Sequence, residues 1–410
     1  MKVIADLHVH SRFARATSKN INFENMEKYA RIKGLSLLGT GDFQHPQWNK
    51  IIKEELKEDE NGILWSKTGF PFIWTTELSF MYSQNGKGRA IHLVVLAPNT
   101  ITADKIITYL SSKGRLDYDG RPIFGISCKQ FVKEIKEIND NIEIIPAHCM
   151  TSWFGVFGSE RGFDSLEECF GEQSKHIYAI ESGMSADPEM LWRFKENVNV
   201  VSFSDAHSFW PWRLGREATI LEINKLSYNG IIKAIRTGLG LIGTIETPPE
   251  YGKYHWDGHR NCNFSCAPEE SKKLNTLCPN CKKRMTIGVE FRVEEISKEP
   301  KGFKTENSKK FYKLIPLHEL IALDLNSRLE SKKVAEKYES MINQFKNELN
   351  ILMNVSEEEI KEKFGEKIAE IIIMARQNKI KIIPGFDGVY GKVVLPSEIK
   401  NENQKKLFNT

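Results

Sequence analysis

The sequence has no long hydrophobic run. Its uncharged apolar stretches are strand-sized, such as Ile91 to Pro98, and fall well short of the roughly 20 residues that span a membrane. The chain enters a strand-like segment at Lys2–Ala5 at once, which leaves no room for a signal peptide. Low-complexity tracts and internal repeats are also absent. We therefore expect a soluble, intracellular protein without a membrane partner.

Charge of one sign is not in marked excess either. The 410 residues contain 58 Lys and Arg against 54 Asp and Glu, and the net charge of +4 is too small to indicate a nucleic-acid partner by itself. With 40% hydrophobic and 27% charged residues, the composition excludes a largely disordered chain, and the length favours two or three domains. Residues 251–313 carry a local basic excess, which fits either a polyanion-binding face or an ordinary solvated surface.

Cysteine is scarce and unevenly placed. Three of the seven cysteines are scattered through the first half of the chain, unlike a disulfide framework, and are interpreted as buried thiols. The other four form a Cys-x3-Cys and a Cys-x2-Cys pair separated by eleven residues: Cys262, Cys266, Cys278 and Cys281. Four thiolates at this spacing suit one tetrahedral structural zinc, which would supply folding energy to a segment too short to bury much core. The alternative is two unrelated reduced pairs.

Short β-rich runs alternate with helix-like segments from residue 1 to about 246. The predicted strands are Lys2–Asp6, Leu35–Gly39, Phe72–Thr76, Ile91–Leu96, Glu143–Ala147, Ile177–Glu181, Val198–Phe203 and Ala218–Glu222. Amphipathic stretches such as Phe23–Lys33 and Lys129–Glu137 lie between them. This alternation predicts an α/β fold of parallel βα units, in an open sheet or a barrel.

A domain border is predicted at Thr247-Pro248-Pro249. It divides the chain into an α/β domain over residues 1–246, a zinc-binding module over 247–290 and a mainly helical C-terminal region over 291–410. Ser356 followed by Glu359 is a good helix start in the last region. A Gly-rich turn at 385–391 then precedes a polar tail. The backbone amides of this turn are candidates for contacting a phosphate or a base.

Histidines and acidic residues follow several of the predicted strands. The set comprises His8, His10, Asp42, Glu77, His148, Asp205 and His207, with His92 at the start of a strand. Because the carboxyl ends of parallel strands meet on one face, these side chains would converge there. Imidazoles and carboxylates bind ions such as Zn²⁺, Mn²⁺ and Fe²⁺, and the set is larger than one closed site needs. Clustered ions of this kind suit phosphoester hydrolysis.

Each histidine taken alone could equally be an ordinary hydrogen-bonded residue. That interpretation is the better one for the four histidines outside the pattern: His176, His255, His259 and His318. The convergence of two paired motifs, His-Val-His and Asp-Ala-His, with further ligand types at strand ends is harder to explain in this way.

These motifs resemble those of the PHP (polymerase and histidinol phosphatase) superfamily. The resemblance rests on His8-Val9-His10-Ser11, the Asp42 segment, Glu77, Ala147-His148 and Ser204-Asp205-Ala206-His207. It implies a distorted (β/α)7 barrel, related to the TIM barrel, with two or three divalent metals (Zn, Mn or Mg). The implied ligands are His8, His10, Asp42, Glu77, His92, His148, Asp205 and His207. Asp42 stands where the second motif of the superfamily usually carries a histidine.

The chain is similar, more specifically, to the endonuclease Q family. The similarity covers the Asp6–Phe13 and Gly39–Phe43 segments, the four-cysteine module, Leu314–Glu319 and Asp387–Gly391. It implies a DNA repair endonuclease that cuts 5′ to deoxyuridine, deoxyinosine, deoxyxanthosine and abasic sites and leaves a 3′-hydroxyl and a 5′-phosphate. Asp205, His8, His10 and Glu77 would then be catalytic, and the protein would be cytoplasmic and associated with the nucleoid.

Damaged DNA, duplex or single-stranded, is the partner that this similarity implies. The candidate DNA contacts are aromatic and basic residues near the metal motifs, the cysteine module and the Gly-rich turn: Trp153, Phe154, Trp210, Trp212, Arg213, Lys282, Lys283, Arg284 and Tyr390. An enzyme that inspects a base edge is expected to flip the nucleotide, and aromatics would stack in the gap. The alternative is that these aromatics pack the top of the fold.

Three further possibilities remain open from the sequence. Gln404–Phe408 begins like a weak sliding-clamp motif, but the chain ends too soon to complete it. The alternative enzyme is a PHP-type small-molecule phosphoesterase. The non-enzyme alternative is a lesion-binding protein with a relic metal site.

Overall fold

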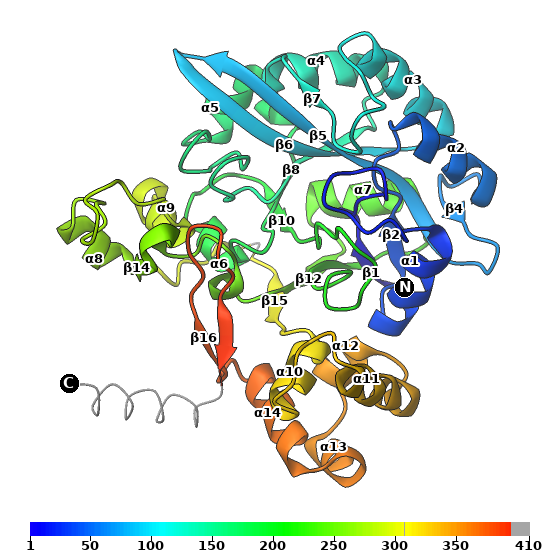
Figure 1. Cartoon of the computed structure of the whole chain (residues 1–410). Helices are drawn as coiled ribbons and strands as arrows, with labels where there is room; N and C mark the ends of the chain where they lie inside the picture. Colours follow the sequence, from blue (N-terminus) through cyan, green and yellow to red (C-terminus); the bar gives the residue numbers. More distant parts are fainter. Residues whose placement is uncertain (307, 395–410) are drawn as a thin grey trace.

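The computed structural model describes residues 1–306 and 308–394 (Figure 1), so the clamp-like segment Gln404–Phe408 lies outside the described residues. The main sheet consists of β1 (Lys2–Asp6), β2 (Leu37–Gly39), β3 (Lys57–Glu58), β4 (Leu64–Trp65), β5 (Pro71–Gln84), β6 (Lys87–Ala97), β7 (Ile123–Phe124), β8 (Glu143–Pro146), β11 (Ala218–Glu222), β12 (Leu241–Glu246) and β15 (Lys310–Lys313). Strands β9 (Ala179–Glu181) and β10 (Asn199–Val201) form a separate parallel pair. All eight predicted strands are present.

The strand directions differ from the expected parallel arrangement. Pairs β1–β2 and β2–β5 are parallel, but β5–β6, β6–β8, β1–β11 and β11–β12 are antiparallel. One cause is visible in the sequence: β5 and β6 are joined by Asn85-Gly86, both at positive φ. This dipeptide is a strong signal for a two-residue hairpin and leaves no room for a crossover helix.

A closed barrel is not confirmed. Within residues 1–306 and 308–394, no strand ladder joins β8 to β9 or β10 to β11. The α/β character of the region is clear, and α1 (Phe23–Lys33), α2 (Pro46–Glu55), α3 (Thr100–Ser111), α4 (Cys128–Ile138), α5 (Leu166–Phe170), η1 (Gly171–His176), α6 (Pro188–Trp192) and α7 (Tyr228–Thr237) surround the strands. Their caps explain their bounds: the side chain of Asn22 accepts from Asn25 N–H before α1, and Gly34 ends it at φ 102°.

A helical region follows the sheet in the chain. It contains α10 (Leu317–Asp324), α11 (Lys332–Phe345), α12 (Glu348–Met353), α13 (Glu357–Phe364) and α14 (Glu366–Arg376), gathered at one end of the molecule (Figure 1). The predicted helix start is confirmed, because Ser356 and Glu359 form a reciprocal capping box.

A buried ion pair joins this helical region to α1. Lys33 Nζ lies 2.7 Å from Glu348 Oε1, and both side chains are buried. Glu348 also accepts from the Tyr338 hydroxyl and from Leu317 N–H, at 2.7 and 3.0 Å. Such a pair is costly to break from one side because a lone charge would stay buried. It therefore fixes how the helices dock on the sheet.

The remaining elements lie between the sheet and the helices in the sequence or after them. They are η2 (Pro249–Tyr251), β13 (Asp257–His259), η3 (Arg260–Cys262), β14 (Phe264–Cys266), α8 (Pro268–Lys273), α9 (Val289–Ile296), β16 (Lys381–Ile383) and β17 (Lys392–Val394). β15, between α9 and α10, pairs with β12, so part of the predicted C-terminal region belongs to the main sheet. The predicted domain borders themselves stay a prediction. None of the described helices is both long and apolar enough to cross a membrane.

Candidate metal centres

The two paired motifs are brought together by backbone contacts. His8-Val9-His10 follows β1, and Asp205-Ala206-His207 follows β10. Val9 forms a parallel bridge with Ala206, and His10 N–H donates to Ala206 O at 3.0 Å. The separation of almost 200 residues in sequence therefore becomes direct contact, as the strand-end argument predicts.

A first ligand group lies at this contact. His8, His10, Glu77 and Asp205 each offer one atom, and these atoms lie within 4.8 Å of one another. His10 Nε2 is 3.1 Å from both Glu77 Oε2 and Asp205 Oδ1, and His8 Nε2 is 3.4 Å from Glu77 Oε2. Asp205 is half-buried, whereas the other three side chains are buried. The group is thus closed on the protein side and open near Asp205.

Glu77 also belongs to a second group, with His92 and His148. Its Oε1 lies 2.7 Å from His92 Nδ1 and 3.0 Å from His148 Nε2. Glu77 and His92 are not at strand ends but inside the β5–β6 hairpin, where Ser79 pairs with His92 and makes it the diagonal neighbour of Glu77. A carboxylate shared by two neighbouring groups is suited to bridging a pair of divalent ions.

The charges of the two groups are strongly coupled. Burial would lower the pKa of His8, but Glu181 and Glu77 raise it well above its usual value. Burial would raise the pKa of Glu77, but the charges of His92 and Arg121 hold it well below its usual range. Burial lowers the pKa of His92 to about 3, so its imidazole is neutral and suited to be a ligand. Protons and metal ions would compete for the same nitrogens.

The donor set fits divalent metal ions. His8 Nε2 is buried without a hydrogen-bond partner that meets geometric criteria, although two carboxylates lie beside it. A buried polar atom of this kind needs an explanation, and an ion between imidazole and carboxylate groups supplies one. The geometry fixes neither the identity nor the number of the ions.

Two carboxylates lie behind the ligands rather than among them. Glu181, at the end of β9, accepts from His8 Nδ1–H with both oxygens at 3.0 Å and from His148 N–H at 2.7 Å. Asp42 accepts from His10 Nδ1–H at 3.0 Å and from Ser11 N–H at 2.6 Å. Each bond leaves the Nε2 atom of its histidine directed at the ligand group, which is the usual role of a carboxylate behind a metal-binding histidine.

Two of the expected ligands lie outside the two groups. Asp42 uses both oxygens on His10 and Ser11 and is not in either ligand group. His207 is also outside both groups; its ring lies 4.5 Å from that of His10, and its Nδ1–H donates to Asp205 O at 3.0 Å. The structure brings together the other six expected ligands: His8, His10, Glu77, His92, His148 and Asp205.

Three residues of this site have a strained backbone. Asp42, His148 and Asp205 adopt positive φ angles of 43°, 30° and 48°. A non-glycine residue in this region costs on the order of 1–3 kcal/mol and persists only when its surroundings impose it. Here the strain turns each side chain toward the centre at the point where its strand ends.

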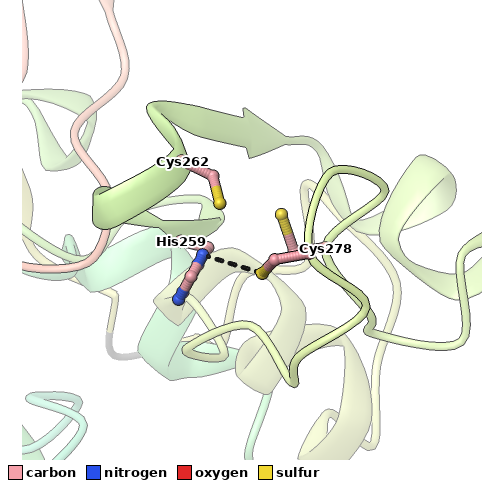
Figure 2. A group of neighbouring side chains, drawn as sticks. His259, Cys262 and Cys278 are labelled. Atoms are coloured by element: carbon pink, nitrogen blue, oxygen red, sulfur yellow. Dashed lines mark hydrogen bonds between the residues drawn. The ribbon is translucent and has the colours of Figure 1, made fainter.

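A separate group with zinc-like geometry lies after residue 257. Cys262, Cys278 and Cys281 converge with His259, and their ligand atoms lie within 4.8 Å of one another (Figure 2). His259 Nδ1 is 3.4 Å from Cys281 Sγ. The structure therefore places His259 where the cysteine spacing predicted Cys266. Cys266 is buried against Cys278 in the same small cluster, but it is not one of the four converging residues.

The predicted aromatic contacts fall into two kinds. Phe154 stacks on His92 with ring centroids 4.3 Å apart, so it packs against a ligand as the alternative interpretation expected. Trp153 and Trp210 are each 40% exposed. Trp210 stacks parallel to Trp212, which in turn contacts His318 of α10. Trp153, Trp210 and Tyr390, which is 39% exposed, therefore have aromatic surface free for a base.

The predicted basic contacts are on the surface, except for one. Lys282, Lys283 and Arg284 are exposed beside the zinc-like group, whereas Arg213 is half-buried beside Tyr390.

Most backbone amides of the Gly-rich turn at 385–391, which we expected to contact a phosphate, already donate hydrogen bonds within the protein. Those of Gly385, Phe386, Gly388, Val389 and Gly391 already donate within the turn or to residues 250–253.

Sequence reasoning missed Arg121 and Glu181. Arg121 Nη1 lies 2.9 Å from Glu77 Oε2 at the edge of the first group, and its side chain is partly exposed. Neither residue belongs to a recognisable motif. The only available signal for Glu181 was its position at the end of a predicted strand, which is the criterion that selected the other site residues.

Two solved structures are similar to this chain over nearly its whole length. The lesion-specific endonuclease PfuEndoQ from Pyrococcus furiosus has a TM-score of 0.86 and 30% identity, covering 98% of this chain and 97% of that one. A structure of endonuclease Q with a 27-mer duplex substrate, which carries an abasic lesion at the active site, has a TM-score of 0.87 at 30% identity and covers 97% of this chain and 98% of that one.

Two matches concern parts of sequences. The family model of the MJ0043 C-terminal domain matches residues 316–379. The uncharacterized protein MJ0043 of Methanocaldococcus jannaschii is 35% identical over 256 residues, which are 60% of this chain and 31% of that protein. The chain thus spans less than a third of the length of this relative.

Proposed function

The chain belongs to the endonuclease Q family, and from this premise we propose that it is a metal-dependent DNA repair endonuclease that hydrolyses the phosphodiester 5′ to a damaged nucleotide. Its substrates would be deoxyuridine, deoxyinosine, deoxyxanthosine and abasic sites, and the products a 3′-hydroxyl and a 5′-phosphate. The observation that carries the proposal is the pair of ligand groups that share Glu77, within a chain that matches lesion-specific endonucleases from end to end.

The six converging residues would hold two divalent ions, with Mg²⁺, Mn²⁺ and Zn²⁺ as candidates: His8, His10, Glu77, His92, His148 and Asp205. His207 lies close enough to Asp205 to join a further site after a small rotation. Bound ions would neutralise the scissile phosphate and lower the pKa of the attacking water. His259, Cys262, Cys278 and Cys281 would hold one structural zinc.

The residues of the chain have distinct tasks in this proposal. Asp205, half-buried at the open side, orients the water and accepts its proton. Glu181 and Asp42 hold His8 and His10 in one tautomer and one orientation. Arg121 at the edge of the group adds positive charge where the phosphate approaches. Because the fold already holds these residues in position, the entropic cost of bringing the reacting groups together is lower.

Lesion recognition would use the exposed aromatics. Trp153 follows His148 and Trp210 follows His207, so both stand on loops that begin at the metal groups. A flipped nucleotide leaves a gap in the duplex, and an exposed indole on such a loop is suited to fill it. The basic residues Lys282, Lys283 and Arg284 would follow the backbone of the flanking duplex.

The test uses end-labelled duplexes with one deoxyuridine, one deoxyinosine, one abasic site or no lesion. We expect a cut on the 5′ side of each lesion in Mg²⁺ or Mn²⁺ and none with EDTA or in the undamaged duplex. A chromogenic phosphomonoester included in the same series tests the small-molecule alternative. Turnover of that ester with no cut in any duplex would refute the proposal, and so would lesion binding without cleavage.

A further inference from the structure

The tip of the β16–β17 hairpin lies between the zinc-like group and the metal centres. On one side, Asp387 accepts from Thr286 Oγ1 and from Arg260 N–H, both at 2.7 Å, directly beside the zinc-like group. On the other side, Tyr390 lies beside the loop that follows His207. A parallel bridge between Trp256 and Phe386 holds the base of the tip. The tip is therefore a fixed part of this surface.

Cations surround the Tyr390 side chain, which is 39% exposed. Lys253 Nζ lies 4.6 Å and Arg213 Cζ 5.5 Å from the centre of its ring. Burial would raise the pKa of the Tyr390 hydroxyl, but Arg216, Arg213 and Lys253 together lower it. All three cations act on one phenol, so positive potential is concentrated at this point.

No carboxylate of the described residues forms a close ion pair with these cations, although Glu319 and Glu217 act on Arg213 and Arg216 at longer range. Among the residues that the structure describes, Arg213, Arg216 and Lys253 form no ion pair within 4.0 Å. Lys301 and Lys313, by contrast, each pair with an acidic side chain. Cations this close together repel one another, and an anion between them would reduce that repulsion.

The cluster is tied to the catalytic loop. Arg216 donates through Nε and Nη2 to Ser204 O, at 3.1 and 3.0 Å, and Ser204 directly precedes Asp205. The remaining guanidinium nitrogen, Nη1, is buried without a hydrogen-bond partner. Two of its nitrogens therefore hold the loop that carries Asp205, and its charge also acts on the Tyr390 hydroxyl.

From this arrangement we infer that Arg213, Arg216, Lys253 and Tyr390 form a binding site for one phosphodiester group of the DNA strand near the lesion. The inference rests on the proposed function and adds to it the place where the backbone is held. A phosphate is favoured over a base because cations contact the ring of Tyr390, while the hydroxyl and the cationic groups are all donors. The site would set the register of the strand relative to the scissile phosphate.

The first experiment measures the affinity for a labelled duplex with one abasic-site analogue as a function of salt. Binding is measured in an Asp205→Asn background, so that bound DNA is not cut. Lys253→Gln and Tyr390→Phe are compared with Lys381→Gln, an exposed lysine on the same hairpin away from the tip. We expect Lys253→Gln to weaken binding about tenfold and to reduce the salt slope by about one, and Lys381→Gln to change neither. An unchanged salt slope would overturn the inference.

The second experiment locates the phosphate. Phosphates around the lesion are replaced one at a time by uncharged methylphosphonates. One position should weaken binding by the parent protein and have no further effect in Lys253→Gln. Equal losses in parent and variant at every position would contradict the inference. Cleavage by the wild-type chain distinguishes failure of the phosphate site from failure of the proposed function. If the wild type cuts lesions while the variants bind DNA like the Asp205→Asn parent, only the phosphate site is refuted. If the wild type does not cut, the proposed function is refuted.

Discussion

The two ligand groups at Glu77 and the group at His259 differ in how the fold builds them. The members of the first two come from positions 8 to 205 of the chain, are mostly buried and keep an open side at Asp205. Those of the other come from 23 consecutive residues, positions 259 to 281, and are partly exposed. A set assembled by the whole sheet is rigid and suited to catalysis, whereas a local set mainly stabilises its own segment.

The difference extends to the residues behind the ligands. His8 and His10 are each held by a buried carboxylate, whereas within the described residues no carboxylate forms a hydrogen bond with His259 of the zinc-like group. The fold thus orients the ligands at the sheet before a metal binds. A zinc ion at the other group would itself stabilise the fold of the segment around it. Variants in the two regions test this distinction.

Asp205→Asn is expected to lower the cleavage rate about 10³-fold or more, because in the proposed mechanism the residue would supply a ligand oxygen and accept a proton at the open side. Single-turnover cleavage of a deoxyuridine duplex measures the rate, and equilibrium binding of the same duplex should stay near wild type. Asp140→Asn, an exposed aspartate elsewhere, is the control. Cleavage retained within tenfold would remove Asp205 from the catalytic role.

Glu181→Ala is expected to weaken metal binding or activity by about 10- to 100-fold, since His8 loses the carboxylate that orients it. Glu181→Gln keeps a hydrogen-bond acceptor and should fall between the wild type and the alanine variant. Calorimetric titration with Mn²⁺ measures the affinity apart from activity. Exposed Glu222→Gln provides the control. If all three variants bind Mn²⁺ like the wild type, Glu181 has no positioning role.

Cys278→Ser is expected to remove about one equivalent of zinc and to lower Tm, while Cys266→Ser keeps the zinc. Elemental analysis and thermal melting of the full chain measure both effects. Loss of zinc in Cys266→Ser with retention in His259→Ala would show that the four cysteines are the ligands after all. We expect neither outcome to change metal binding at the two ligand groups that share Glu77.

The smallest effect is expected for His259→Cys. This variant presents four thiolates in place of three and an imidazole, and both sets suit tetrahedral zinc. Zinc content should stay the same and Tm should change little. A loss of zinc would mean that the backbone at His259 cannot direct a shorter side chain at the ion.

The same contrast explains what the sequence could predict. The strands follow from local patterns, and strand ends and paired motifs place His8, His10 and Asp205 without knowledge of the sheet order. Glu77 and His92 lie inside the β5–β6 hairpin, so the strand-end pattern does not explain their positions. Asp42 satisfied the same pattern, yet its carboxylate accepts a hydrogen bond from His10 Nδ1–H, on the side of the ring away from the ligand group. Only the relative position of two strands distinguishes a ligand from its support, and no local pattern encodes that position.

The remaining differences have similar causes. The antiparallel β5–β6 hairpin was encoded by Asn85-Gly86, a signal that the alternation of strands and helices obscured. His259 precedes the first cysteine by three residues, and spacing alone favoured the more familiar set of four cysteines. The carboxylate of Glu181 becomes meaningful only when β9 lies beside His8 and His148.

The most direct test of the central claim is cleavage of end-labelled duplexes that differ only in one lesion, in the presence and absence of divalent metal. The account predicts a single metal-dependent cut 5′ to the lesion that disappears with EDTA and in Asp205→Asn. Cleavage that is equal in the undamaged duplex, or no cleavage with any metal, would contradict it.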